Sequence, residues 1–196
     1  MWKPDYVEGE ELAAFTNAEL GDPYIAGIAT AASRAVDEWC NRQFGQLDAP
    51  ATFVYDAATA LAGQLPDGRW LVAIDDIGGA TGLAVAIDGT AVTAGATGYG
   101  LWPANAVAKG KVYTHLVLAD RPYGELAVTA RFGWPSVPAA VIVATRLQGA
   151  RWHARRQSPY GTTGSPAEGT ELRLSARLDP DVRASLMGYA RARRPR

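Results

Sequence analysis

The sequence predicts an α+β fold, in which both ends of the chain form a small helical bundle that carries an inserted antiparallel β-sandwich or barrel-like domain. Near each end, apolar residues recur at steps of three and four, the spacing of amphipathic helices. In the middle, short apolar runs are separated by glycine, proline and aspartate, which is typical of short strands and tight turns. We therefore expect a discontinuous helical domain, residues 1–45 and 134–196, and a β domain, residues 46–133. At 196 residues and 48% apolar content, the chain is long enough to bury a core.

Two helices are expected before the β domain. A short helix is predicted from Gly9 to Leu20. A long helix follows, with the Asp22 carboxylate as its N-terminal cap and Pro23 at its first position, where a missing N–H costs nothing. Gly45 is expected to end it, because glycine readily takes the left-handed conformation that follows a last helical turn.

The long helix carries a single apolar stripe that the rest of the chain must cover. Four core residues define it, Ile25, Ile28, Val36 and Trp39, and three small ones complete it, Ala29, Ala32 and Cys40. Ser33 is expected on the opposite, polar side. We predict that Trp39 and its stripe pack on a later helix around Val141 and Leu147.

Two further helices are expected after the β domain. Ser136 is a plausible cap for a second long helix that ends near Gln157. Asp179 and Pro180 repeat the cap-and-proline pair and open a last short helix. Residues 190–196 form a basic tail.

The β domain is expected to contain five to seven strands. Asp88 and Gly89 favour a tight hairpin between Leu83–Ile87 and Ala91–Thr93. In the last run, Leu126, Val128, Ala130 and Phe132 alternate, which predicts that they share one buried face. The runs that supply the strands are residues 51–57, 69–75, 83–89, 91–94, 113–119 and 125–133.

Charge is divided unevenly along the chain, although the net charge is only −1. From Arg146 onward there are 11 arginines and 4 acidic residues, whereas before it there are 8 basic and 16 acidic residues. The two parts therefore suit partners of opposite charge, and they also suit each other.

Residues that could perform chemistry are few. His115, His153 and Cys40 do not stand at ligand spacing from one another, so neither a metal site nor a nucleophilic centre is predicted. Asp75 and Asp76 could hold a divalent cation only if they faced the same side, and adjacent strand residues point to opposite faces. The sequence therefore predicts no enzyme, no cofactor and no metal.

No segment indicates export or membrane insertion. The first eleven residues lack a basic stretch followed by an apolar one, and no apolar run approaches the roughly 20 residues of a membrane span. A soluble protein is expected.

Three stretches together resemble a known family. They are AASRAVDEWCNRQFG, residues 31–45; the run from LWPANAVAKGKVYTHLVL to VTARFGWPSVPAAVIVATRLQGARW, residues 101–152; and DPDVRASLMGYARAR, residues 179–193. The order of these stretches is similar to that in head-to-tail adaptors of long-tailed bacteriophages that infect actinobacteria.

The resemblance implies a structural virion protein of the neck, between capsid and tail, that resides in the host cytoplasm during assembly. Twelve copies would form a ring below the portal protein, receive the stopper or tail-completion protein, and let DNA pass without reading its sequence. In relatives the C-terminal segment reaches the portal. This implies a contact with the portal or a neighbour for Arg191, Arg193, Arg194 and Arg196.

Two other readings stay open at this stage. The arginine-rich C-terminal region could belong to a nucleic-acid-binding module, since guanidinium groups suit phosphates as well as carboxylates. The second reading is an enzyme whose active site is not recognisable in one sequence.

Overall fold

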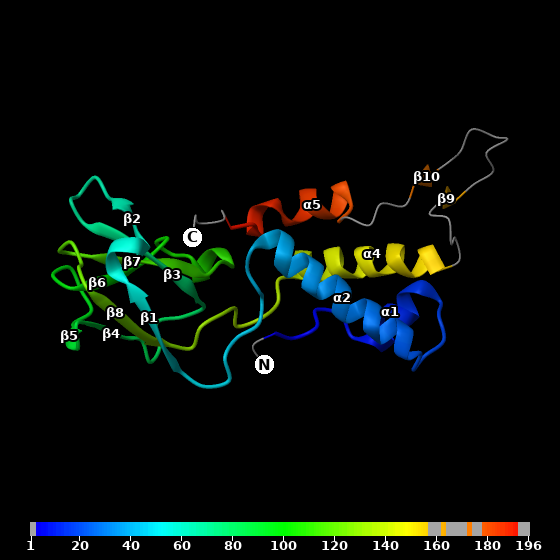
Figure 1. Ribbon diagram of the computed structural model, residues 1–196, viewed down its shortest axis with the longest axis horizontal. Coiled ribbons are helices and arrows are strands. Elements are labelled where there is room, and N and C mark those ends of the chain that lie inside the picture. The colour runs from blue at the N-terminus through cyan, green and yellow to red at the C-terminus, as the bar shows by residue number, and fades with distance from the viewer. Residues whose placement is uncertain (1–2, 157–161, 164–171, 174–177, 192–196) are drawn as a thin grey trace. The chain divides into compact units, whose positions relative to one another are not determined.

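The computed structural model describes residues 3–156, 162–163, 172–173 and 178–191, and it divides the chain into two compact units. The helical unit comprises Lys3–Phe44 and the described residues from Val137 onward, and the β unit comprises Gly45–Ser136 (Figure 1). Helices and antiparallel sheets are both present, so the predicted α+β class is confirmed.

The helical unit is built around α4, which contacts each of the other helices of the unit (Figure 1). Its elements are α1 (Gly9–Thr16), α2 (Pro23–Cys40), α4 (Ala139–Arg156), α5 (Pro180–Leu186) and the 3-10 turn η3 (Met187–Tyr189). In addition, two short strands, β9 (Thr162–Thr163) and β10 (Leu172–Arg173), pair antiparallel.

The helix starts follow the sequence closely. The Asp22 carboxylate accepts a hydrogen bond from the Tyr24 amide at 2.9 Å, and the Asp179 carboxylate accepts one from the Asp181 amide at 3.0 Å. Each cap is followed directly by a proline, as expected. These starts could be predicted because a cap depends only on residues two or three positions away.

The helix ends differ from the prediction. Helix α1 stops at Thr16 because Asn17 adopts the left-handed conformation (φ 52°), so the helix does not continue to Leu20. Asn41 does the same after α2 (φ 50°), which ends that helix well before Gly45. Asparagine tolerates this conformation better than most residues, which is why it could take the role assigned to glycine.

The predicted stripe on α2 forms the core of the helical unit, with two corrections. Ile25, Ile28 and Val36 are buried, but Trp39 is only half-buried, although it lies on the same side of the helix as the buried Ile28. Ser33, which was expected on the polar side, is fully buried.

The predicted packing partner on α4 is half right. Val141 is fully buried, but Leu147 keeps 38% of its surface exposed. Leu147 lies about 120° around the helix from Val141, so the two cannot share one buried face. The face that carries Val141 also buries Ala144, Thr145 and Gln148.

The β unit contains two antiparallel four-stranded sheets, and neither closes into a barrel. One sheet has the order β1-β8-β4-β5 and the other β2-β3-β7-β6. The connections include a one-turn helix, α3 (Ala57–Ala60), and a 3-10 turn, η1 (Val107–Lys109). The strands are β1 (Ala51–Asp56), β2 (Leu61–Gln64), β3 (Trp70–Ile77), β4 (Ala84–Ile87), β5 (Thr90–Val92), β6 (Tyr99–Trp102), β7 (Tyr113–Leu118) and β8 (Glu125–Ala130).

The predicted hairpin is confirmed, whereas two strands were missed. Asp88 (φ 46°) and Gly89 (φ 75°) turn the chain between β4 and β5. Strands β2 and β6, LAGQ and YGLW, were not predicted because each is short and contains a glycine, which weakens the strand pattern. Leu126, Val128, Ala130 and Phe132 are all buried, as the alternation predicted.

The segment Phe132–Pro135 is fixed by contacts at every position. Phe132 stacks on Phe53 with ring centroids 4.0 Å apart. The indole N–H of Trp134 donates to the buried carboxylate of Asp76 at 2.9 Å. The next residue, Pro135, lies against Gly78, where a Cβ would come within 2.3 Å of the proline ring.

Candidate subunit-contact surfaces

The groups weighed for chemistry are spread over the two units. His115 lies on β7 with Nδ1 2.8 Å from the Thr114 hydroxyl, and His153 lies on α4. Cys40 is fully buried at the end of α2, and burial raises the pKa of its thiol to about 12. Among the described residues, no three side chains of the metal-ligating types come together.

The adjacent carboxylates of β3 point to opposite sides. Asp75 is exposed and accepts a hydrogen bond from the Tyr55 hydroxyl at 2.9 Å, whereas Asp76 is buried against Trp134. Both carboxylates thus serve the packing of the β unit rather than a shared cation.

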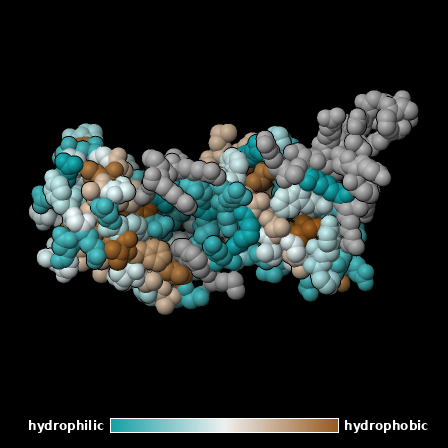
Figure 2. Space-filling model, in the orientation of Figure 1, coloured by the Kyte–Doolittle hydropathy of each residue, from teal (hydrophilic) through white to brown (hydrophobic). Residues whose placement is uncertain are grey.

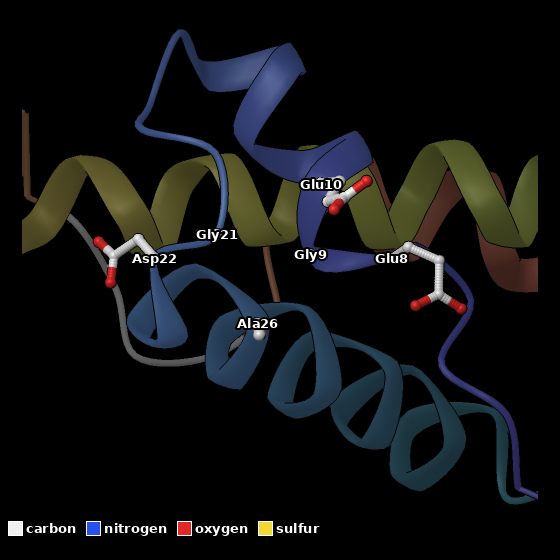
Figure 3. Close-up of a pocket in the computed structure, with 6 residues that line it drawn as sticks. All are labelled: Glu8, Gly9, Glu10, Gly21, Asp22 and Ala26. Carbon is white, nitrogen blue, oxygen red and sulfur yellow. The ribbon is translucent and has the colours of Figure 1, made fainter.

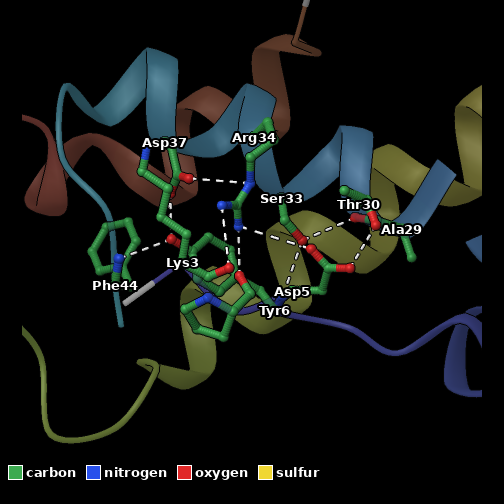
Figure 4. Close-up of polar contacts among 10 residues, drawn as sticks. Lys3, Asp5, Tyr6, Ala29, Thr30, Ser33, Arg34, Asp37 and Phe44 are labelled. Atoms are coloured by element: carbon green, nitrogen blue, oxygen red, sulfur yellow. Dashed lines mark hydrogen bonds and ion pairs between the residues drawn. The ribbon is translucent and has the colours of Figure 1, made fainter. Parts of the chain in front are cut away.

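A polar network ties the N-terminal segment to α2 (Figure 4). The Tyr6 hydroxyl donates to Asp37 and accepts from the Phe44 amide at 2.8 Å. The Ser33 hydroxyl accepts from the Tyr6 amide and donates to the Ala29 carbonyl, both at 2.9 Å. The network therefore fixes a segment that has no regular structure of its own.

Arg34 completes this network on its exposed side. Its guanidinium donates to the carbonyls of Pro4 and Lys3 and pairs with Asp37 at 3.3 Å. Burial raises the pKa of the Asp37 carboxyl, and the hydrogen bond from Tyr6 and the Arg34 charge offset part of that rise. The pKa of Tyr6 is raised too, first by burial and then by Asp37.

The first two helices of the chain carry an acidic surface. Between Lys3 and Arg34 there is no basic residue, and six acidic residues occur. A cavity of about 320 Å³ opens there between the starts of α1 and α2, with three carboxylates around it (Figure 3). Its lining consists of Glu8, Gly9, Glu10, Gly21, Asp22 and Ala26.

The segment that connects α1 to α2 also exposes apolar side chains. We call this segment, residues 17–24, together with Glu8 and Glu10, the acidic corner. Leu20 is 68% exposed and Tyr24 41%. The side chains of Glu10 and Glu19 have no hydrogen bond or ion pair within the described part of the chain. The corner thus offers apolar surface and uncompensated negative charge together.

Helix α4 has the opposite charge. Its sequence contains four arginines and no acidic residue. Arg151 pairs with Asp179 and, at 3.4 Å, with Asp181, which links α4 to α5. Arg146 lies over the Phe15 ring at 5.7 Å, and neither Arg146 nor Arg155 has a carboxylate partner among the described residues.

Between these arginines α4 presents an apolar surface, which we call the α4 stripe: Val143 and Leu147, continued by Ala150 and Ala154. Val143 is 52% exposed and Leu147 38%. Four residues apart on a helix, they lie side by side, about 40° from each other. Figure 2 shows exposed apolar groups on both units, so exposure alone does not distinguish the α4 stripe. The stripe differs from the other exposed apolar groups because its residues are aligned along one helix and are flanked by arginines.

The predicted contact residues of the tail are described only in part. The Arg191 amide donates to the Cys40 carbonyl at 2.8 Å, so the backbone there is fixed to the end of α2. Tyr189, just before it, packs edge-on against Phe44 with centroids 6.0 Å apart. Arg193, Arg194 and Arg196 lie outside the described residues.

No protein-family model matches the sequence, and no curated protein matches it. Within the described residues, no helix is both long and apolar enough to cross a membrane.

The acidic corner and the α4 stripe were not identified from the sequence as surfaces. The charge division pointed toward them, because it separates the acidic first helices from the arginine-rich α4. The stripe was hidden because Ala139 to Ala144 is apolar on nearly every side, so the sequence alone does not show which side stays exposed.

Proposed function

We propose that this chain is a head-to-tail adaptor of a long-tailed bacteriophage. In that role, twelve copies form a ring below the portal protein, continue the DNA channel, and join the capsid to the stopper or tail-completion protein. The DNA passes through without sequence recognition. The protein resides in the host cytoplasm during assembly and in the neck of the finished virion.

The observation that carries the proposal is the pair of unlike surfaces on the helical unit. A ring needs two different surfaces on each subunit that fit one another, because head-to-tail contacts must repeat until they close. The acidic corner and the arginine-bearing α4 have opposite charge, and each exposes large apolar side chains. A monomer that acts alone has no need of this pairing.

The resemblance supports the same role independently. The two parts of the sequence that resemble the family most specifically are residues 31–44 and the run Phe132–Pro135 with Val137 and Pro138. The structure gives each a packing role: the first contains Ser33, Arg34 and Asp37 of the polar network, and the second holds the β unit together through Trp134 and Asp76.

A nucleic-acid-binding module is the competing proposal. Arg146 and Arg155 of α4 favour it, because neither has a carboxylate partner among the described residues. Against it, Arg151 is already paired with two carboxylates, and Arg146 is stacked on Phe15. Binding of a DNA duplex by the isolated chain, measured by fluorescence anisotropy at increasing salt, separates the two. Several phosphate contacts give an affinity that falls steeply and linearly with log salt, whereas an adaptor gives weak binding with a shallow slope.

The adaptor role is tested by complementation. A phage infection in which this chain is not made is expected to produce DNA-filled heads and separate, complete tails. Adding the purified full chain to a mixture of these heads and tails should restore joined, infective particles. Heads that join tails equally well without the chain would contradict the proposal.

A further inference from the structure

We infer that the acidic corner of one copy docks on the α4 stripe of a second copy, so that Leu20 and Tyr24 cover Val143 and Leu147. The closure of such contacts into a ring rests on the proposed function. The contact between two copies does not, because it can be measured in solution. The occupant of the stripe is therefore another copy of this chain.

Charge complementarity selects that occupant. The stripe lies on a helix with four arginines and no acidic residue, and the corner belongs to a segment with six acidic residues and no basic one. The side chains of Arg155 on one surface and Glu10 and Glu19 on the other have no ionic partner among the described residues. Joining the two surfaces would pair these charges around an apolar centre, which is the usual arrangement of a protein interface.

Both surfaces are open in the single chain. Leu20 and Tyr24 are 68% and 41% exposed, and Val143 and Leu147 are 52% and 38% exposed. The side chains that are fully buried on α2 and α4 include Ile25 and Val141, and these four residues are not among them. Substitutions at the exposed positions can therefore block docking without removing core side chains.

A contact between two different surfaces makes a prediction that a self-complementary contact does not. A corner-blocked copy, Leu20→Arg, keeps its stripe, and a stripe-blocked copy, Val143→Gln with Leu147→Gln, keeps its corner. Each blocked copy alone keeps only one working surface, so its association with itself should be much weaker than that of the wild type. A mixture of the two has one working pair, so it should form dimers and nothing larger.

The experiment is sedimentation velocity of the full chain and its variants over a concentration series at low salt. The wild-type chain should associate increasingly with concentration, and added salt should weaken this association. Each blocked copy should associate at least about tenfold more weakly, and their equimolar mixture should recover association that stops at the dimer. The control variant Val54→Gln, at a 59% exposed valine of the β unit, should behave as the wild type.

Three results would overturn the inference. They are a mixture that stays monomeric, a mixture that grows beyond dimers, and blocked copies that associate as the wild type does. A monomeric mixture would also result if another segment of the same chain covered the stripe. If the mixture forms dimers but the chain is absent from the phage neck, the adaptor function is refuted and the contact between copies stands. If the blocked copies form normal rings in the phage neck, the contact is refuted and the adaptor function stands.

Discussion

The hydroxyl of Tyr6 donates a hydrogen bond to the carboxylate of Asp37, although 31 residues separate the two in the sequence. The same oxygen accepts a hydrogen bond from the Phe44 amide. One side chain thus joins the N-terminal segment, the last part of α2, and the point where the chain leaves the helical unit.

Removal of the Tyr6 hydroxyl should destabilise the protein. Tyr6→Phe leaves the ring in place but removes the oxygen that accepts from the buried Phe44 amide and that donates to Asp37, which costs about 1–3 kcal/mol of unfolding free energy. Urea denaturation measures the change. Tyr123→Phe is the control, since Tyr123 is 63% exposed, and it should change stability by less than about 0.5 kcal/mol. Equal effects of the two variants would mean that the network contributes nothing.

Asp37 should make stability depend on pH. Its pKa in the folded protein is raised above the ordinary value of 3.8, first by burial, despite the Tyr6 hydroxyl and the nearby Arg34 and Lys3 charges. The folded state therefore holds this proton more tightly than the unfolded state, so the contribution of Asp37 is most favourable below pH 3.8 and is lost as pH rises through the folded pKa.

The variant Asp37→Asn isolates this effect because it cannot ionise. Its stability relative to the wild type should rise with pH above about 3.8, as the wild-type carboxyl loses its proton. Denaturant titrations at several pH values measure the difference. Glu38→Gln, at an exposed position of the same helix, serves as the control. A difference between Asp37→Asn and the wild type that falls with pH would show that the pKa is lowered instead.

Gly133 should tolerate no side chain. Its φ is 105°, and a Cβ would lie 1.9 Å from the Gly45 carbonyl oxygen. We expect Gly133→Ala to cost at least about 4 kcal/mol, because strain and overpacking act together. Gly110 also has positive φ (63°) but open space around it, so Gly110→Ala should cost only about 1–2 kcal/mol. Similar losses in the two variants, measured by thermal unfolding, would contradict the close approach.

The Cys40 thiol should react only after the helical unit opens. It is fully buried, and burial raises its pKa to about 12, so little thiolate exists at pH 8. Labelling by a disulfide reagent should be slow in the native protein and fast in denaturant. Native labelling as fast as that of an unstructured cysteine peptide would show that this end of α2 is open.

Features that depend on near neighbours could be predicted from the sequence. The caps at Asp22 and Asp179 and the hairpin at Asp88 and Gly89 each depend on residues a few positions apart. Leu126 and its alternating partners were predictable too, because one buried face fixes a period of two.

Features that depend on partners far away in the sequence could not be predicted. Ser33 is buried because its hydroxyl meets the Tyr6 amide, 27 residues away, and no local pattern reveals that bond. Leu147 lies beside the buried face of α4 rather than on it, and an apolar residue near the edge of a stripe looks the same in a sequence as one at its centre. Trp39 lies on the same side of α2 as the buried Ile28, but it is only half-buried. The α4 stripe was missed because Leu147 was assigned to the buried face and Val143 lies in a run that is apolar on nearly every side.

The most direct measurement of the adaptor role is electron cryo-microscopy of intact phage particles that carry this chain, with the neck reconstructed. The account predicts a ring of twelve copies between portal and tail. In that ring, Leu20 of each copy should face Leu147 of the next, and the DNA channel should run through the centre. A neck density built without this chain, or this chain found elsewhere in the particle, would contradict the account.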